Sequence, residues 1–261
     1  MTDILKDKLE EKRKRGKLFL PYLTFGYPDI PTFLDLMHIC EEEGVDALEV
    51  GIPHSDPLAD GPVIQTTSQR ALEKGVTPQL VAQTLEEEKT TLPLIAMTYG
   101  NIVYQYGFSR FARDFKNAGF SGLIIADFPR EARNLEKDME GYLSRILLAS
   151  VTSPPERIKQ IAKESEGFVY LVSGKGTTGQ VEIEKEHLRE VVEVIKGASS
   201  SLVLIGFGVN SPEKAKRLAE IADGVIVGSA LLQVILQEEK HPQPAFRRLL
   251  SSYRQALNKI S

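Results

Sequence analysis

The sequence predicts a (β/α)8 barrel with an extra N-terminal helix and additional helices. Short apolar runs alternate with longer stretches of helical spacing, and the alternation continues until it reaches eight strands. The strands are apolar almost throughout, which is typical of a parallel sheet covered on both faces. Eight such units in 261 residues match the size of this barrel.

The eight predicted strands are four to seven residues long and rich in β-branched and other apolar residues. In chain order they are LFLPYLT at 18–24, ALEV at 47–50, LPLIAMT at 92–98, LIIAD at 123–127, RILLAS at 145–150, FVYLVS at 168–173, LVLIGF at 202–207 and GVIVGS at 224–229.

Amphipathic stretches between these strands predict the covering helices. Several open with Pro or Ser-Pro and close on Gly, as helices often do. They lie at residues 31–44, 108–119, 154–167, 185–197 and 211–222. The extra helices are expected near residues 3–15, 78–89 and 243–258.

A doubly wound open sheet is the competing architecture. That arrangement usually has a glycine-rich first turn, and FGYPD after the first strand has neither the dinucleotide nor the P-loop pattern. The barrel is therefore favoured. Because no linker, low-complexity stretch or composition break divides the chain, we expect residues 1–261 to form one domain.

Composition argues against several classes of protein. A formal net charge of -4 and a pI near 5.7 disfavour an electrostatic nucleic-acid binder. No segment approaches the length of a membrane helix, and the N-terminus lacks a signal-peptide core, so we expect a cytoplasmic protein. The single cysteine cannot form an intramolecular disulfide, and the four histidines have no metal-ligand spacing, so no metal site is expected.

An acidic pair follows the second strand, in the stretch ALEVGIPHSDPLADGP at 47–62. In this barrel the C-terminal ends of the strands form the active-site face. If Leu48 and Val50 pack outward against helices, strand alternation points Glu49 into the barrel mouth. Burial there would raise its pKa, which suits a group that both gives and takes a proton. A surface or salt-bridged strand-end glutamate is the alternative.

For Asp60, two interpretations stay open. It caps backbone amides in an Asp-Gly turn, or a long loop with three prolines carries it back over the mouth. His54, in the same loop, is either a proton relay or a packing or solvent-facing side chain. Tyr22, Tyr99 and Tyr170 fall at or near strand ends, where they either line the mouth or are half-buried rim residues without a function.

Glycine-bearing loops late in the chain predict an anion site. GFG at 206–208 follows the seventh strand and GS at 228–229 follows the eighth, and helices are expected to begin at Ser211 and near Ala230. These two loops form the phosphate site of many barrels, because their amides and helix N-termini face an anion. SGKGTTGQ at 173–180 either adds further donors or is only a mobile linker. A phosphorylated small molecule is therefore the expected ligand.

The stretch at 47–62 resembles the signature of the tryptophan synthase alpha chain family. The similarity continues in PYLTFGYPD, YGN at 99–101, ADFP at 126–129, the TTG-bearing loop, GFGVNSPE at 206–213 and VGSA at 227–230. The resemblance implies a barrel lyase that cleaves indole-3-glycerol phosphate to indole and glyceraldehyde 3-phosphate in tryptophan biosynthesis. It implies no cofactor in this chain, and an alpha2beta2 complex with a beta chain that carries pyridoxal phosphate.

The resemblance also implies roles for individual residues. Glu49 would be the general acid/base, and Asp60 the carboxylate that assists at the indole nitrogen. The implied substrate positions are Tyr22, Met97, Tyr99, Ile124 and Leu148 around the indole, Tyr170 near Glu49, and Thr178, Gly179, Phe207, Gly208, Gly228 and Ser229 around the glycerol phosphate. The chain departs from the family at His54 and Tyr22, where phenylalanine is common, and in SGKGTTG, where the family more often has SRxGVTG.

Two alternatives come from other functional classes. One is a Schiff-base aldolase on the same barrel with Lys175 as nucleophile, although a lysine between two glycines past the strand end is poorly placed for desolvation. The other is a non-catalytic activating subunit, which the presence of both Glu49 and Asp60 disfavours.

Overall fold

The computed structural model describes residues 3–128, 137, 139–173 and 185–260. Its strands form one parallel sheet in the order β5-β4-β3-β2-β1-β9-β8-β7-β6. The strands are β1 Leu18–Thr24, β2 Leu48–Gly51, β3 Leu94–Thr98, β4 Phe120–Ile125, β5 Ser144–Arg145, β6 Leu147–Ser150, β7 Phe168–Val172, β8 Leu202–Gly206 and β9 Gly224–Val227.

The sheet closes into a barrel because its two edge strands belong to one chain segment. β5 pairs with β4, whereas β6 pairs with β7. Only Ile146 separates β5 from β6, and its N–H donates to the carbonyl of Leu123 at 2.9 Å. The strand predicted at 145–150 is therefore split, because the segment changes neighbour at Ile146. The predicted barrel is confirmed, and β5 and β6 together take the place of one of its eight strands.

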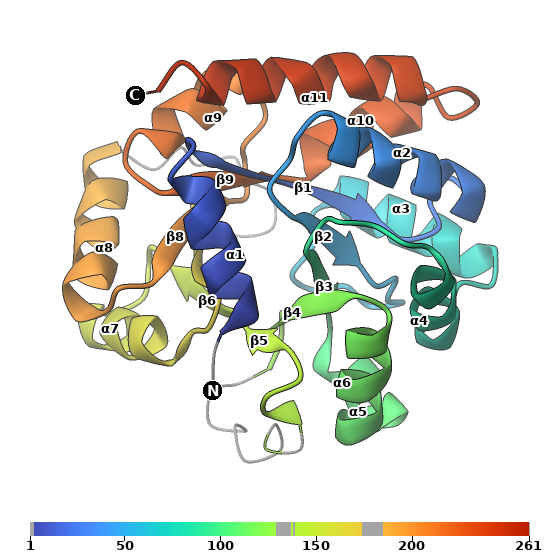
Figure 1. Cartoon of the computed structure of the whole chain (residues 1–261), viewed down its shortest axis with the longest axis horizontal. Helices are drawn as coiled ribbons and strands as arrows, with labels where there is room; N and C mark the ends of the chain where they lie inside the picture. Colours follow the sequence, from blue (N-terminus) through green and yellow to red (C-terminus); the bar gives the residue numbers. More distant parts are fainter. Residues whose placement is uncertain (1–2, 129–136, 138, 174–184, 261) are drawn as a thin grey trace.

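Helices surround the barrel (Figure 1). Those in the described residues are α1 Ile4–Arg13, α2 Ile30–Glu42, α3 Pro62–Glu73, α4 Pro78–Glu87, α5 Gly100–Tyr106, α6 Phe108–Asn117, α7 Pro155–Glu164, α8 Lys185–Ala198, α9 Pro212–Ala219, α10 Ser229–Gln237 and α11 Gln243–Leu257. Every predicted helix is present. None of the helices in these ranges combines the length and apolarity needed to cross a membrane.

Two helices of the structure, α3 and α5, were not predicted. The buried residues of α3 are Thr67, Ser68 and Ala71, so this helix lacks the large apolar stripe that reveals an amphipathic helix in a sequence. α5 has only seven residues. α5 follows β3 after a single residue, whereas a loop of ten residues, 52–61, separates α3 from β2. α3 matters most here because it anchors the loop that carries Asp60.

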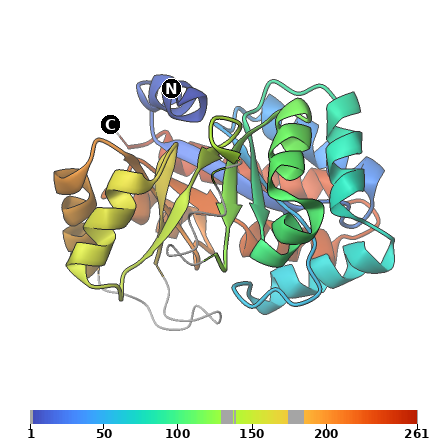
Figure 2. The same cartoon turned by 90° about the horizontal axis from the view of Figure 1, so that it is seen from below.

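The N-terminal helix α1 closes one end of the barrel. Its Leu5 is fully buried against the strand ends, where a Cβ on Gly122 would lie 2.7 Å from Leu5 Cδ2. Gly122 thus leaves room for the Leu5 side chain that fills this end of the barrel. Figure 2 shows α1 at this end and α3 at the opposite end, where the strands terminate. The C-terminal ends of the strands lie at the end of the barrel that α1 does not cover.

Candidate active site

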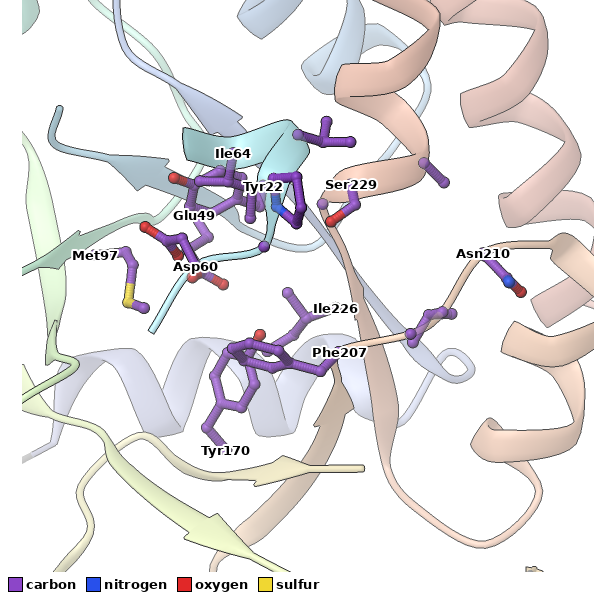
Figure 3. A pocket seen from close by; sticks show the side chains of 17 residues that line it. Tyr22, Glu49, Asp60, Ile64, Met97, Tyr170, Phe207, Asn210, Ile226 and Ser229 are labelled. Atoms are coloured by element: carbon purple, nitrogen blue, oxygen red, sulfur yellow. The ribbon is translucent and has the colours of Figure 1, made fainter. Parts of the chain in front are cut away.

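A cavity of about 290 Å³ lies at the C-terminal ends of the strands. Strands β1, β2, β3, β7 and β9 and the loops after β2, β8 and β9 contribute its walls. The lining residues are Tyr22, Glu49, Asp60, Gly61, Pro62, Val63, Ile64, Met97, Tyr170, Phe207, Gly208, Val209, Asn210, Ile226, Gly228, Ser229 and Ala230. Figure 3 shows Glu49 and Asp60 together on one side of the cavity and Asn210 far from them, with Ser229 between.

Most of the predicted site residues line this single cavity. They are Tyr22, Glu49, Asp60, Met97, Tyr170, Phe207, Gly208, Gly228 and Ser229. Tyr99 is not in the lining but contacts Asp60. Ile124 and Leu148 are not in the lining either, and they are the strand partners of Met97 and Tyr170. Thr178, Gly179 and Lys175 lie outside the described residues.

The lining residues that were missed include Ile226, Ile64 and Asn210. Ile226 lies two residues before Gly228 on β9, so strand alternation from the predicted phosphate loop would have pointed to it. Ile64 lies in the first turn of α3, a helix that the sequence did not reveal. Asn210 lies in the loop between β8 and α9, and its amide had no pattern that distinguished it from a turn residue.

Glu49 is the more deeply buried of the two carboxyl groups. It lies opposite Tyr22 in the β1–β2 register, and it is 2% exposed. Its Oε2 has no hydrogen-bond partner among the described residues. Burial, and secondarily the negative charge of Asp60, raises the pKa of Glu49 to about 8. Glu49 therefore carries its proton at neutral pH and presents an unpaired carboxyl oxygen.

Asp60 is 5% exposed, and its loop and α3 hold it from both sides. Its N–H donates to the carbonyl of Pro57 at 3.0 Å, and Gln65 Nε2 donates to its carbonyl at 2.9 Å. The hydroxyl of Tyr99 donates to Asp60 Oδ2 at 2.9 Å. The N-cap of α3 is Gly61, so the Asp60 side chain does not cap that helix. Burial raises the pKa of Asp60 to about 6, although the Tyr99 hydrogen bond lowers it.

Two phenol side chains reach into the cavity because the strands beside them carry glycine. A Cβ on Gly51 would lie 1.9 Å from Tyr22 Oη, and one on Gly206 would lie 2.3 Å from Tyr170 Oη. Burial and the nearby carboxyl groups raise the pKa of both phenols well above the usual value. Both phenols therefore stay neutral and can only donate or accept hydrogen bonds.

The far end of the cavity is built from backbone. Phe207 and Gly208 both have left-handed backbone, with φ of 64° and 72°. This conformation is unusual for phenylalanine, and such strain is concentrated at functional sites. The Oγ of Ser173 lies 2.9 Å from the carbonyl oxygen of Gly206 and 2.6 Å from that of Phe207, which holds the turn in place.

The N-terminus of α10 completes this end. Gly228 is its N-cap and Ser229 its first residue, and both line the cavity. The first amides of a helix have no acceptor within the helix and carry the positive end of its dipole. Together with the turn at Gly208, they form a site that suits a phosphate.

His54 does not line the cavity, and it lies next to Tyr99. Its ring stacks on Tyr99, with 4.7 Å between centroids. The ring face, and not a ring nitrogen, meets the phenol, so the structure gives His54 a packing contact and not a relay position. No group of three His, Cys, Asp or Glu side chains within the described ranges is arranged to hold a metal.

Comparison with known proteins places this geometry in context. Residues 8–260 match the sequence profile of a family described as the tryptophan synthase alpha chain. The tryptophan synthase alpha chain of Dehalococcoides mccartyi is 41% identical over 87% of this chain and 91% of its own length. That of Arabidopsis thaliana is 38% identical over 91% and 88%. The crystal structure of the alpha subunit from Legionella pneumophila superposes with a TM-score of 0.88 at 35% identity and covers 100% of both chains. A chain of Mycobacterium tuberculosis tryptophan synthase gives a TM-score of 0.87 at 35% identity over 97% of this chain and 98% of its own.

Proposed function

The chain belongs to the tryptophan synthase alpha chain family, and we propose that Glu49 and Asp60 perform the chemistry of this family in it. The chain is a lyase that cleaves indole-3-glycerol phosphate to indole and glyceraldehyde 3-phosphate in tryptophan biosynthesis. It needs no cofactor of its own and works with a beta chain, which carries pyridoxal phosphate. One observation supports our assignment above all: two buried carboxyl groups of unequal pKa share a cavity with a phosphate-type backbone site.

Glu49 moves the proton that the cleavage requires. The protonated carboxyl group donates its proton to C3 of the indole ring, which leaves the ring cationic and Glu49 ionised. The carboxylate then takes the proton of the side-chain hydroxyl on the carbon bonded to C3. As that oxygen becomes a carbonyl, the electrons of the breaking carbon–carbon bond return to the ring. The net result is transfer of the hydroxyl proton to C3, and Glu49 is again protonated.

Asp60 stabilises the charge that develops on the ring. With its pKa near 6, Asp60 is mainly ionised at neutral pH. Its carboxylate accepts a hydrogen bond from the indole N–H, and the low polarity of the buried site strengthens its attraction for the cation. The ring itself accepts the electrons of the broken bond, so the reaction needs no metal or organic cofactor.

The roles of the remaining predicted residues are proposed from the family resemblance, and Tyr22, Met97 and Tyr170 also line the cavity, whereas Tyr99, Ile124 and Leu148 do not. We propose that Tyr22, Met97, Tyr99, Ile124 and Leu148 surround the indole and that Tyr170 lies beside Glu49. Phe207, Gly208, Gly228 and Ser229 bind the glycerol phosphate, and Thr178 and Gly179, outside the described residues, are proposed for the same end. We further propose that residues 1–261 form one domain, since each described helix surrounds or caps the one barrel, and that the protein acts in the cytoplasm in an alpha2beta2 complex.

The assignment is tested by indole release from indole-3-glycerol phosphate, with and without the beta chain. Glu49→Gln preserves shape but cannot move a proton, so we expect cleavage to fall by about 10²-fold or more. Binding of glycerol phosphate should stay within about threefold, because the backbone site is untouched. Activity within about tenfold of wild type would exclude Glu49 as the principal acid/base. Trapping with borohydride tests the aldolase alternative, in which Lys175 would become covalently labelled.

A further inference from the structure

We propose that His54 is a positioning residue for Asp60 and acts through the ring of Tyr99. The inference rests on the proposed role of Asp60 in catalysis. His54 lies in the loop between β2 and α3, six residues before Asp60, and it does not line the cavity. Its influence on the reaction must therefore pass through a neighbour.

Two hydrogen bonds hold His54, one through its backbone and one through its imidazole. Its backbone N–H donates to Ser68 Oγ on α3 at 3.2 Å, and the N–H of Asp56 donates to its Nδ1 at 3.0 Å. An acceptor at Nδ1 carries no hydrogen, so in the neutral ring the hydrogen lies on Nε2. The side chain thus closes a turn onto the residue two positions later, which fixes the plane of its ring.

This ring lies against Tyr99 at the end of β3. The two ring planes are inclined by 20° at a centroid separation of 4.7 Å, and Tyr99 is 3% exposed. Stacked rings at this separation attract each other, and the contact restricts tilting of the phenol. His54 therefore forms one wall of the slot in which the Tyr99 ring is held.

The Tyr99 hydroxyl in turn holds the far end of the same loop. It accepts a hydrogen bond from the N–H of Ala59 at 3.2 Å and donates one to Asp60 Oδ2 at 2.9 Å. Both ends of the loop thus contact the same phenol, that of Tyr99. Its start supplies the ring that packs on Tyr99, and its end supplies the two groups that bond to the hydroxyl.

Loss of the stack would change Asp60 in two ways. The carboxylate would be less well placed for the indole nitrogen, and misplacement on the order of 1 Å costs about 10²-fold in rate. The Tyr99 hydrogen bond also lowers the pKa of Asp60, so a weaker bond would raise it. The other titratable groups nearby are Asp127, whose charge adds to burial in raising the pKa of Tyr99, and Glu49 and Tyr22, whose pKa values are raised by burial and by the charge of Asp60. A substitution at His54 changes none of these groups.

Three substitutions of His54 distinguish the contribution of the stacked ring from that of the Nδ1 acceptor. His54→Ala removes both, His54→Phe keeps the stack without the acceptor, and His54→Asn keeps an acceptor for the Asp56 N–H without the stack. We expect kcat for indole release to fall about tenfold in the Ala and Asn variants, with KM within about twofold, and to recover in the Phe variant. Full activity of His54→Asn with loss in His54→Phe would overturn the proposal, because the turn and not the ring would then matter.

A double-mutant cycle tests whether the effect passes through Tyr99. Tyr99→Phe keeps the ring but loses the hydroxyl, so adding His54→Ala to it should cause little further loss of kcat. Additive losses would show that His54 acts by another route and would overturn the proposal. The cycle is run on the free chain and at saturating beta chain. A defect that appears only with the beta chain would make His54 a partner contact and would equally overturn it.

The pKa of the Asp60 carboxyl group, followed by ¹³C NMR, gives a readout that does not require turnover. It should rise in His54→Ala and stay at the wild-type value in His54→Phe, and an unchanged pKa in His54→Ala would refute the positioning contact. Wild type and Glu49→Gln in the indole assay test the proposed function separately. If wild type released no indole, the function would fail, while the NMR titration would still decide the link between His54 and Asp60.

Discussion

The stability of a Glu49→Gln variant, measured relative to wild type, should increase as the pH rises. Burial raises the pKa of Glu49 from its ordinary 4.5 to about 8. Between these values the unfolded chain releases the proton while the folded protein keeps it, so the folded state is favoured at low pH and loses stability as the pH rises through 8. Glutamine has no proton to lose, so the Glu49→Gln variant lacks this dependence.

The size of the effect follows from the pKa shift, since one pKa unit corresponds to about 1.36 kcal/mol. Integrated from pH 5 to pH 8, the Glu49 contribution to the free energy of unfolding changes by roughly 3 to 4 kcal/mol. The buried amide has its own cost, but that cost does not vary with pH. The free energy of unfolding of Glu49→Gln, minus that of wild type, should therefore increase by about this amount between pH 5 and pH 8.

Urea denaturation of both proteins at pH 5, 6, 7 and 8 measures this difference. The matched control is Glu193→Gln on α8, where the side chain is exposed and the same chemical change should shift stability by less than about 0.5 kcal/mol at every pH. If the wild-type and Glu49→Gln stabilities ran parallel across this range, Glu49 would not hold its proton in the folded state. The assignment of Glu49 as the acid at neutral pH would then be wrong.

Three further predictions concern activity and binding. The profile of kcat/KM against pH should have an acid limb near 6, where Asp60 takes up a proton, and an alkaline limb near 8, where Glu49 loses one; a profile without these limbs would contradict the assigned protonation states. Gly208→Ala puts a Cβ on left-handed backbone at φ 72°, so calorimetry should show about tenfold weaker binding of both glycerol phosphate and inorganic phosphate. Unchanged affinity would locate the phosphate elsewhere. Gly51→Ala would place a Cβ 1.9 Å from Tyr22 Oη, so the phenol must move and kcat/KM should fall about tenfold; wild-type kinetics would show that the phenol position is not critical.

Glu49 could be predicted from the sequence because its position depends on two general rules. Strand alternation decides which side of β2 a side chain faces, and the barrel decides which strand end holds the site. The glycine loops after β8 and β9 could be predicted for the same reason. The packing of His54 on Tyr99 could not, because that contact depends on how far the loop after β2 folds back toward β3.

Two other features depend on the three-dimensional register of the sheet. The strand predicted at 145–150 breaks at Ile146 because one segment must pair with β4 and then with β7 to close the barrel. Gly51 and Gly206 carry no sequence signal that links them to Tyr22 and Tyr170. Their importance follows from the close approach of neighbouring strands, where the register brings each glycine under a phenol.

The two carboxyl groups of the site are chemically alike, and their surroundings give them different charges. Glu49 has an unpaired buried oxygen, so burial favours its protonated form. Asp60 is almost as buried but accepts the Tyr99 hydroxyl, and a hydrogen bond to the charged form favours ionisation. Near pH 7 one group is therefore an acid and the other a base, which is the combination that protonation of a ring and stabilisation of the resulting cation require. Tyr99 thus lets two neighbouring carboxyl groups hold opposite protonation states, although its side chain lies outside the cavity.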